Sequence, residues 1–380
     1  MPVDRTVIAY GAAHFGKSLF WYASELLFAF YLTEVAGLRP LYMGVAVATG
    51  LLVSAGIDLA VGRGLAGMMH APASAGRLQL VGAITSTIFL IAVFLADRLP
   101  MGWRFSYAIA ASVGFRMAYA LYDVPQNTLL GLLEWPGVGR SGMSAIRLTG
   151  SGLASILVSF EVGAGFGAPL SHMGSANLLT IMIVFAVVAL ATSVVLQWAL
   201  GPLQWSSSES GHGPGRSRRM LLYPLLLTLA ASASFSLFTK LEPYFGVHTL
   251  GSARWAGLII GAFSLGAVVA QPCWAYVVAR FARKGILACQ GILLLLTTLI
   301  FMTWARESQT LSLVLAFGLG ILNGGVNLLL WRWIADVAAQ DPAGRPSFAF
   351  AIFSSASKVA LAFAGIAIGV TLQSIDYRGQ

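Results

Sequence analysis

Long apolar runs alternate with short polar ones along this chain. A transmembrane helix needs about 20 consecutive, predominantly apolar residues. A window of that length gives candidate helices at residues 7–34, 40–62, 78–97, 103–131, 144–169, 176–200, 220–245, 255–280, 285–304, 311–334 and 347–373. The pattern predicts an all-α polytopic membrane protein with about eleven transmembrane helices.

One long polar stretch interrupts this pattern. Residues 201–219 contain the consecutive serines Ser206 to Ser208 and the run Gly211-His212-Gly213-Pro214-Gly215, which is typical of a flexible linker. We therefore expect an N-terminal six-helix bundle in residues 1–200, a cytoplasmic linker in 201–219 and a C-terminal bundle of five helices in 220–380. A twelfth helix is expected to be either absent or lost by truncation.

Composition excludes a soluble protein, because 58% of the residues are hydrophobic and 10% are charged. The net charge of +9 comes from basic residues in short loops between the apolar runs, so we do not expect nucleic-acid binding. With a cytoplasmic N-terminus, most of these residues fall in inner loops, among them Arg63, Arg77 and Arg140. The positive-inside bias thus predicts a multi-pass protein of the bacterial cytoplasmic (inner) membrane with its N-terminus inside.

Five charged residues lie within or at the edge of apolar segments: Asp58, Arg116, Asp123, Arg147 and Lys358. A charge at this depth is costly, so it normally faces a partner or a water-filled path. The sequence shows no nucleophile–base pairing, metal-ligand set or phosphate loop, so we expect no enzyme, no cofactor and no metal. The pattern favours a transporter, and the rival class is a non-transporting sensor or scaffold.

Four residues are candidates for binding a solute. Lys17 and Trp21 form, with Glu25, a polar stripe at every fourth residue, which suits a solute path; the alternative is a buried Lys17–Glu25 pair. Asp123 and Arg147 suit a hydroxylated solute, because a carboxylate accepts from hydroxyl groups and a guanidinium donates in a fork. We expect these two side chains to pair or to share a cavity; the alternative is an ion pair that only joins two helices.

Several motifs, in order along the chain, resemble the glycoside-pentoside-hexuronide:cation symporters, the melibiose-permease group of the major facilitator superfamily. They are Tyr10-Gly11, Phe15-Gly16-Lys17 and the run 31–38, then Tyr122-Asp123-Val124-Pro125 and Arg147, then Pro272-Cys273-Trp274 and the run 280–284, and last Ala335-Asp336-Val337 and Lys358. The motifs are spread over most of the chain. The resemblance implies two helical bundles that rock around a site near the bilayer midplane.

The chain also departs from that family. Ser54 stands where the family has the first of two cation-binding carboxylates, so that only Asp58 remains, and Ala120 replaces a sodium-ligating threonine. Ser18 and Asn127 replace a sugar-binding aspartate and a sugar-stacking tryptophan. The resemblance therefore implies the scaffold of a symporter with an altered sodium site and an altered sugar site.

Asp58, Arg116 and Lys358 are the candidates for ion coupling or charge compensation. Arg116 lies seven residues before Asp123 on the same helical face, so its guanidinium can replace a cation and neutralise Asp58 or Asp123; alternatively it extends to the outer interface. Lys358 can pair with Asp58 or release a proton. We expect the three to face one cavity, and sodium coupling is not expected, because one carboxylate makes a poor sodium cage.

Four residues near helix ends are left outside the predicted site. Lys240 and Glu242 are expected either to gate the outer end of their helix or to anchor it at the interface. Trp331 and Trp333 fit an interfacial tryptophan belt.

The sequence predicts a monomeric secondary transporter that moves a small organic solute by alternating access, either proton-coupled or facilitative, with a sugar or glycoside favoured. Its partners would be this solute, the lipid bilayer and, if transport is coupled, protons. The alternative is an exporter of amphipathic compounds or lysolipids, since the sugar-binding aspartate and the stacking tryptophan are missing.

Overall fold

The computed structural model describes residues 5–133, 135, 137–167, 175–201, 219–250, 253–339 and 346–374. These residues form helices and no strand. The α-helices are α1 Arg5–Tyr22, α2 Phe28–Phe30, α3 Pro40–Gly64, α4 Pro72–Val93, α5 Met101–Leu132, α6 Gly139–Gly167, α7 Ser175–Leu200, α8 Arg219–Tyr244, α9 Ala253–Val269, α10 Gln271–Arg280, α11 Arg283–Trp304, α12 Gln309–Ala338 and α13 Pro346–Ser374. The expected linker falls almost entirely on residues 202–218, outside the described part of the chain.

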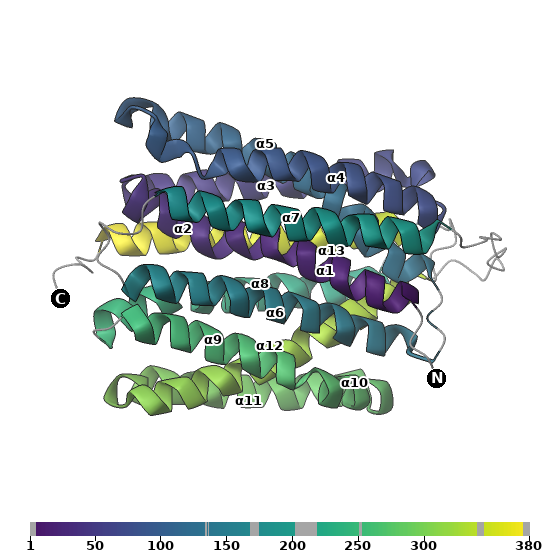
Figure 1. The fold of residues 1–380 in the computed structure, drawn as a ribbon. Coiled ribbons are helices and arrows are strands. Elements are labelled where there is room, and N and C mark those ends of the chain that lie inside the picture. The colour runs from purple at the N-terminus through teal and green to yellow at the C-terminus, as the bar shows by residue number, and fades with distance from the viewer. Residues whose placement is uncertain are drawn as a thin grey trace.

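Each expected span coincides with a helix or with consecutive helices of the structure (Figure 1). Within the described residues, eight helices are long and apolar enough to cross a membrane, and α9 with α10, bent by 44°, makes a ninth. The first span and α5 are not among them. Both carry buried charged residues, Lys17 and Glu25 in the first span and Arg116 and Asp123 in α5, and π-helical turns divide the first span into short helices.

Two of the spans contain π-helical turns, which are rare and often mark functional sites. In the first span, η1 Ala23–Leu27 and η2 Tyr31–Val35 lie on either side of the short α2. In the second half of the chain, η6 Phe245–Thr249 follows α8 directly. Glu25 lies within η1, and Glu242 lies three residues before η6. A buried carboxyl group therefore lies in or beside a π-helical turn in both spans.

The helices pack mainly within two halves of the chain, α1–α7 and α8–α13. In the first half α1 packs on α6 and α7, and α4 packs on α5 and α7; in the second, α12 packs on α9 and α11, and α8 packs on α13. In Figure 1, α3, α4 and α5 lie on one side of the molecule and α10 and α11 on the other. The main contacts between the halves are α3 with α13 and α6 with α9; α6 also packs on α10 and α12, and α5 on α13. The central part of the molecule thus lies between helices of both halves.

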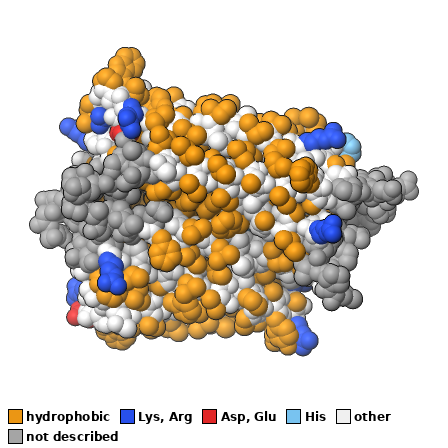
Figure 2. Space-filling model, viewed as in Figure 1, with side chains coloured by type: hydrophobic (Ala, Val, Ile, Leu, Met, Phe, Trp, Pro, Cys, Tyr) orange, Lys and Arg blue, Asp and Glu red, His pale blue; other side chains and the backbone are white. Residues whose placement is uncertain are grey.

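The outer surface matches a lipid environment. Figure 2 shows hydrophobic side chains across the middle of one face, with Lys and Arg towards its two ends. Large apolar side chains point outward, for example Phe160, Trp198 and Met302. The structure therefore describes a multi-pass membrane protein whose polar side chains are largely turned inward.

Candidate functional site

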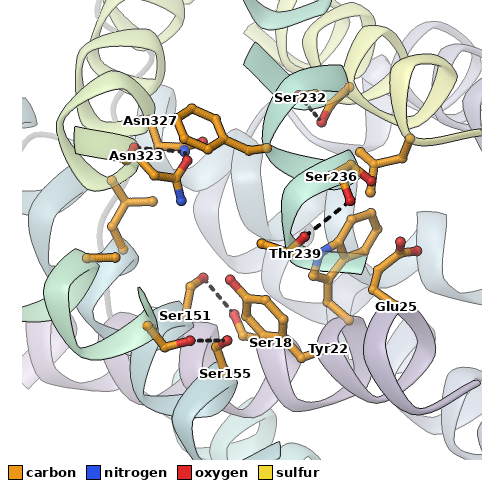
Figure 3. Close-up of a pocket in the computed structure, with 18 of the residues that line it drawn as sticks. Ser18, Tyr22, Glu25, Ser151, Ser155, Ser232, Ser236, Thr239, Asn323 and Asn327 are labelled. Carbon is orange, nitrogen blue, oxygen red and sulfur yellow. Dashed lines mark hydrogen bonds between the residues drawn. The ribbon is translucent and has the colours of Figure 1, made fainter. Parts of the chain in front are cut away.

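A cavity of about 290 Å³ lies between the two halves and is lined by α1, η1, α5 and α6 on one side and by α8, α9, α10, α12 and α13 on the other. Its walls carry many hydroxyl and amide groups. Figure 3 shows those of Ser18, Tyr22, Ser151, Ser155, Ser232, Ser236, Thr239, Asn323 and Asn327. The volume is at the lower end of the range for pockets that bind small molecules.

Lys17 and Asp123 form a buried ion pair beside this cavity. The Lys17 ammonium group donates to Asp123 Oδ1 at 2.7 Å and to Asn127 Oδ1 at 2.8 Å. Asp123 and Asn127 are one helical turn apart on α5, and the Asn127 amide also donates to Asp123 Oδ1 at 3.0 Å. Ser354 of α13 donates to the other carboxylate oxygen of Asp123 at 3.3 Å. Asp123 therefore pairs with Lys17, and Asn127, at the position of the family's tryptophan, supports this pair.

Arg147 of α6 lines the same cavity as Asp123, so the expectation of a shared cavity is confirmed, although the two residues do not form an ion pair. Its Nε donates to His14 Nε2 at 3.1 Å, and its guanidinium lies 3.2 Å from the ring centre of Trp331. Because His14 Nε2 accepts this bond, His14 carries its proton on Nδ1, which donates to Gln126 Oε1 at 3.3 Å. Arg147 Nη1 is buried and has no hydrogen-bond partner within the described structure.

Arg116 pairs with Glu25, which corrects the expectation that it neutralises Asp58 or Asp123. Its Nη2 lies 2.5 Å from Glu25 Oε1, and Lys240 of α8 lies 2.9 Å from Glu25 Oε2. Arg116 is 1% exposed, so it does not extend to the outer interface either. The physical reason is that Glu25, which belongs to η1, lies within reach of α5. Lys17 and Glu25 therefore pair with different residues. Trp21 lines the cavity, and the centre of its ring lies 5.2 Å from Arg116 Cζ.

Asp58 and Lys358 form a second pair between the halves, from α3 to α13. Their side chains are 0% and 2% exposed, and Lys358 Nζ lies 2.6 Å from Asp58 Oδ2. Of the three residues Asp58, Arg116 and Lys358, only Lys358 lines the central cavity, so the expectation of one shared cavity is wrong. Packing explains the difference, since Asp58 is covered where α3 contacts α13. Ser54 Oγ and Asp58 Oδ1 are buried without a hydrogen-bond partner among the described residues.

Trp331 is the main residue of the cavity that sequence reasoning placed elsewhere. Instead of lying at the membrane interface, it lines the cavity and covers Arg147. Asn323, Asn327 and Trp331 recur at every fourth residue of α12 and all line the cavity. This is the same spacing that identified the stripe of Lys17, Trp21 and Glu25, so the signal was present in the sequence.

Solved structures of other proteins share this fold. The major-facilitator proton:xylose symporter XylE, bound to 6-bromo-6-deoxy-D-glucose, matches with a TM-score of 0.70 and 13% identity, covering 98% of this chain and 89% of that chain. A bacterial homologue of the iron transporter ferroportin, outward-facing with soaked iron, matches with a TM-score of 0.63 and 12% identity over 99% of both chains. At these identities the likeness establishes the fold alone, and it confirms the predicted two-bundle architecture.

Sequence relatives include proteins described as symporters. An uncharacterized symporter of Synechocystis sp. is 26% identical over 251 residues, which are 61% of this chain and 44% of that protein. The sodium-dependent lysophosphatidylcholine symporter 1-A of Danio rerio is 25% identical over 182 residues, 43% of this chain and 33% of that protein. The match therefore spans less than half the length of either relative. Residues 9–380 match the family described as MFS/sugar transport protein, which agrees with the resemblance carried by the motifs. The chain belongs to this family of major-facilitator transporters.

Proposed function

We propose that this protein moves a small hydroxylated solute, of the size of a sugar or glycoside, across the bacterial cytoplasmic membrane by alternating access. The observation that carries the proposal is the central cavity, whose walls combine hydroxyl and amide groups from both halves of the chain (Figure 3). A solute with many hydroxyl groups can exchange hydrogen bonds with such walls in place of water. Because both halves contribute, movement of one half against the other would open the site to each side in turn.

The charged residues have different roles in this proposal. Arg147 binds the solute, because its Nη1 is the buried guanidinium nitrogen of the cavity that lacks a partner among the described residues. Trp21 and Trp331 provide aromatic surfaces on opposite halves. Lys17 and Asp123 hold each other, so they bind the solute only if it enters their hydrogen-bond network. Asp58 and Lys358 compensate each other and hold α3 against α13.

The moving units would be the two predicted bundles, residues 1–200 and 220–380, joined by a cytoplasmic linker at 201–219, with the N-terminus in the cytoplasm. Ion pairs cross between these units near two sets of helix ends. Lys240 of α8 pairs with Glu25 of η1 at 2.9 Å, and Asp336 of α12 lies 3.9 Å from Arg140 of α6. For the cavity to open to one side of the membrane, one of these two ion pairs has to break. The energy would come from a proton gradient or from the solute gradient itself.

Transport by the purified monomer in liposomes tests the proposal. The panel should hold hexoses, disaccharides and glycosides, with lysophosphatidylcholine as an amphipathic comparison, and liposomes without protein give the background. We expect saturable uptake of at least one hydroxylated solute, with gradients of sodium and of protons imposed separately. Movement of the lysolipid alone would reject the sugar proposal in favour of the amphipathic alternative, and movement of none would favour a sensor or scaffold.

A further inference from the structure

Glu242 is a buried carboxyl group without a hydrogen-bond or ion-pair partner among the described residues. It lies on α8, lines the central cavity and is 2% exposed. Both of its carboxyl oxygens are buried and make no hydrogen bond, and no ion pair involves it within the described residues. An isolated carboxylate in such a place is very costly, and the usual outcome is that the group binds a proton and becomes neutral.

The other charged groups of the cavity form no ion pair with Glu242 within the described residues. Those that line it from the described part of the chain are Lys17, Glu25, Asp123, Arg147, Lys240 and Lys358. Of the elements packed against α8, α13 contributes Lys358, which pairs with Asp58, while α9, α12 and η6 contribute no charged side chain to the lining. On α8 itself, Lys240 is held by Glu25. Arg147 has no carboxylate partner, but its guanidinium donates to His14 and lies against Trp331. Among the described residues, no cation of the cavity therefore forms an ion pair with Glu242.

The position of Glu242 links it to a contact between the two halves. Lys240, two residues earlier on α8, donates to the side chain of Glu25 at 2.9 Å and to its backbone oxygen at 3.3 Å. We call this pair the latch. Pro243 follows Glu242 directly, and it lacks the backbone N–H that would continue the helical hydrogen bonding. The helical hydrogen-bond pattern of α8 is therefore interrupted directly after Glu242.

We propose that Glu242 is a proton-binding site of this protein, neutral while the latch is closed and ionised when separation of the halves admits water to it. This inference rests on the proposed transport function for its role in the cycle. In the closed arrangement the carboxyl group holds one proton; on opening, the proton passes to water and a hydrated carboxylate remains. Linkage then requires that protonation favours the closed arrangement.

Infrared spectroscopy tests the protonation without any solute. The purified protein in lipid is titrated with acid and base, and the spectrum of the Glu242→Gln variant is subtracted from that of the wild type. We expect a carbonyl stretch of a neutral carboxylic acid at neutral pH that disappears at alkaline pH. Glu307→Gln, which changes an exposed carboxylate paired with Arg306, should leave this band in place. Absence of the band at neutral pH would overturn the proposal, whether or not the protein transports anything.

Transport in liposomes tests the role in coupling. An inward proton gradient should stimulate uptake by the wild type and by Glu307→Gln, and this stimulation should be lost in Glu242→Gln, with uptake normalised to the protein inserted. Glu242→Asp keeps a carboxyl group and should restore part of the stimulation. This recovery would show that the loss in Glu242→Gln comes from the missing proton site and not from misfolding. Stimulation that persists in Glu242→Gln would overturn the coupling role. If the wild type moves no solute at all, the proposed function fails, and the infrared result still decides the proton site.

Discussion

Arg147 is a cation of the cavity that no carboxylate neutralises among the described residues, and in the proposed function its Nη1 binds the solute. We expect Arg147→Gln to weaken solute binding by about 10- to 100-fold, because a hydrogen bond to a charged group contributes roughly 1.5–3 kcal/mol. Arg147→Lys should bind with intermediate affinity, since it keeps the charge but not the flat group that stacks on Trp331. The concentration dependence of uptake measures both effects.

Arg306→Gln is the matched control for these variants, because Arg306 is exposed and pairs with the adjacent Glu307. It should transport with unchanged affinity. Unchanged affinity of Arg147→Gln, in protein that is inserted normally, would remove Arg147 from the binding site.

The pair of Asp58 and Lys358 gives a stability prediction. Asp58→Asn leaves the Lys358 ammonium buried without its counter-ion, and breaking a buried pair in this way costs about 3–5 kcal/mol. The thermal unfolding temperature in detergent should therefore fall. The double variant Asp58→Asn with Lys358→Met should recover most of the loss, because no uncompensated charge remains. A double variant as unstable as the single one would contradict this explanation.

Sodium is not expected to raise the affinity for the solute. Asp58 already accepts from Lys358 at 2.6 Å, Ser54 offers a hydroxyl group in place of a second carboxylate, and Ala120 has no side-chain oxygen. Uptake with sodium or potassium on both sides should show equal half-saturation. A sodium-dependent rise in affinity that Asp58→Asn abolishes would reverse this prediction, because coupled ligands strengthen each other's binding.

At the scale of the helices, α9 and α12 touch through glycine. A Cβ added to Gly320 of α12 would collide with the backbone carbonyl of Phe263 in α9. Gly320→Ala is therefore expected to destabilise the protein by about 1–3 kcal/mol, as overpacking does in other proteins. Gly318→Ala is the control, since its nearest atom would be Thr297 Cγ2 at 3.9 Å. Equal unfolding temperatures for the two variants would contradict the close contact.

The spans themselves were largely predictable, and their irregularities were only partly so. Long apolar runs identified the helices because a bilayer requires continuous hydrogen bonding within each one. The bend of 44° between α9 and α10 has a visible cause in Pro272, which cannot donate a backbone hydrogen bond. The π-helical turns at Ala23–Leu27 and Phe245–Thr249 have no comparable signal in the hydrophobic pattern.

At the scale of the whole molecule, the proposed alternating access would move α6 against α9, because they belong to different halves and are in contact. Ser155 Oγ of α6 lies 2.8 Å from Ser264 Oγ of α9. In a background where the free Cys273 and Cys289 are replaced by serine, Ser155→Cys with Ser264→Cys should form a disulfide under oxidation and stop transport. Reductant should restore transport, and each single cysteine variant should be insensitive to oxidation. Transport that continues through a fully formed cross-link would exclude movement at this contact.

The sequence by itself determined the spans, the family and the set of residues that carry charge inside the membrane. Polar groups are costly in lipid, so the spans are apolar runs in which each charged residue is easily recognised. Only the tertiary structure decided the pairing of those charges. Lys17 pairs with Asp123 and Arg116 with Glu25, although both acids and both bases were known from the sequence. Partner choice depends on how helices distant in the chain cross and turn, and the hydrophobic pattern of single helices does not contain that geometry.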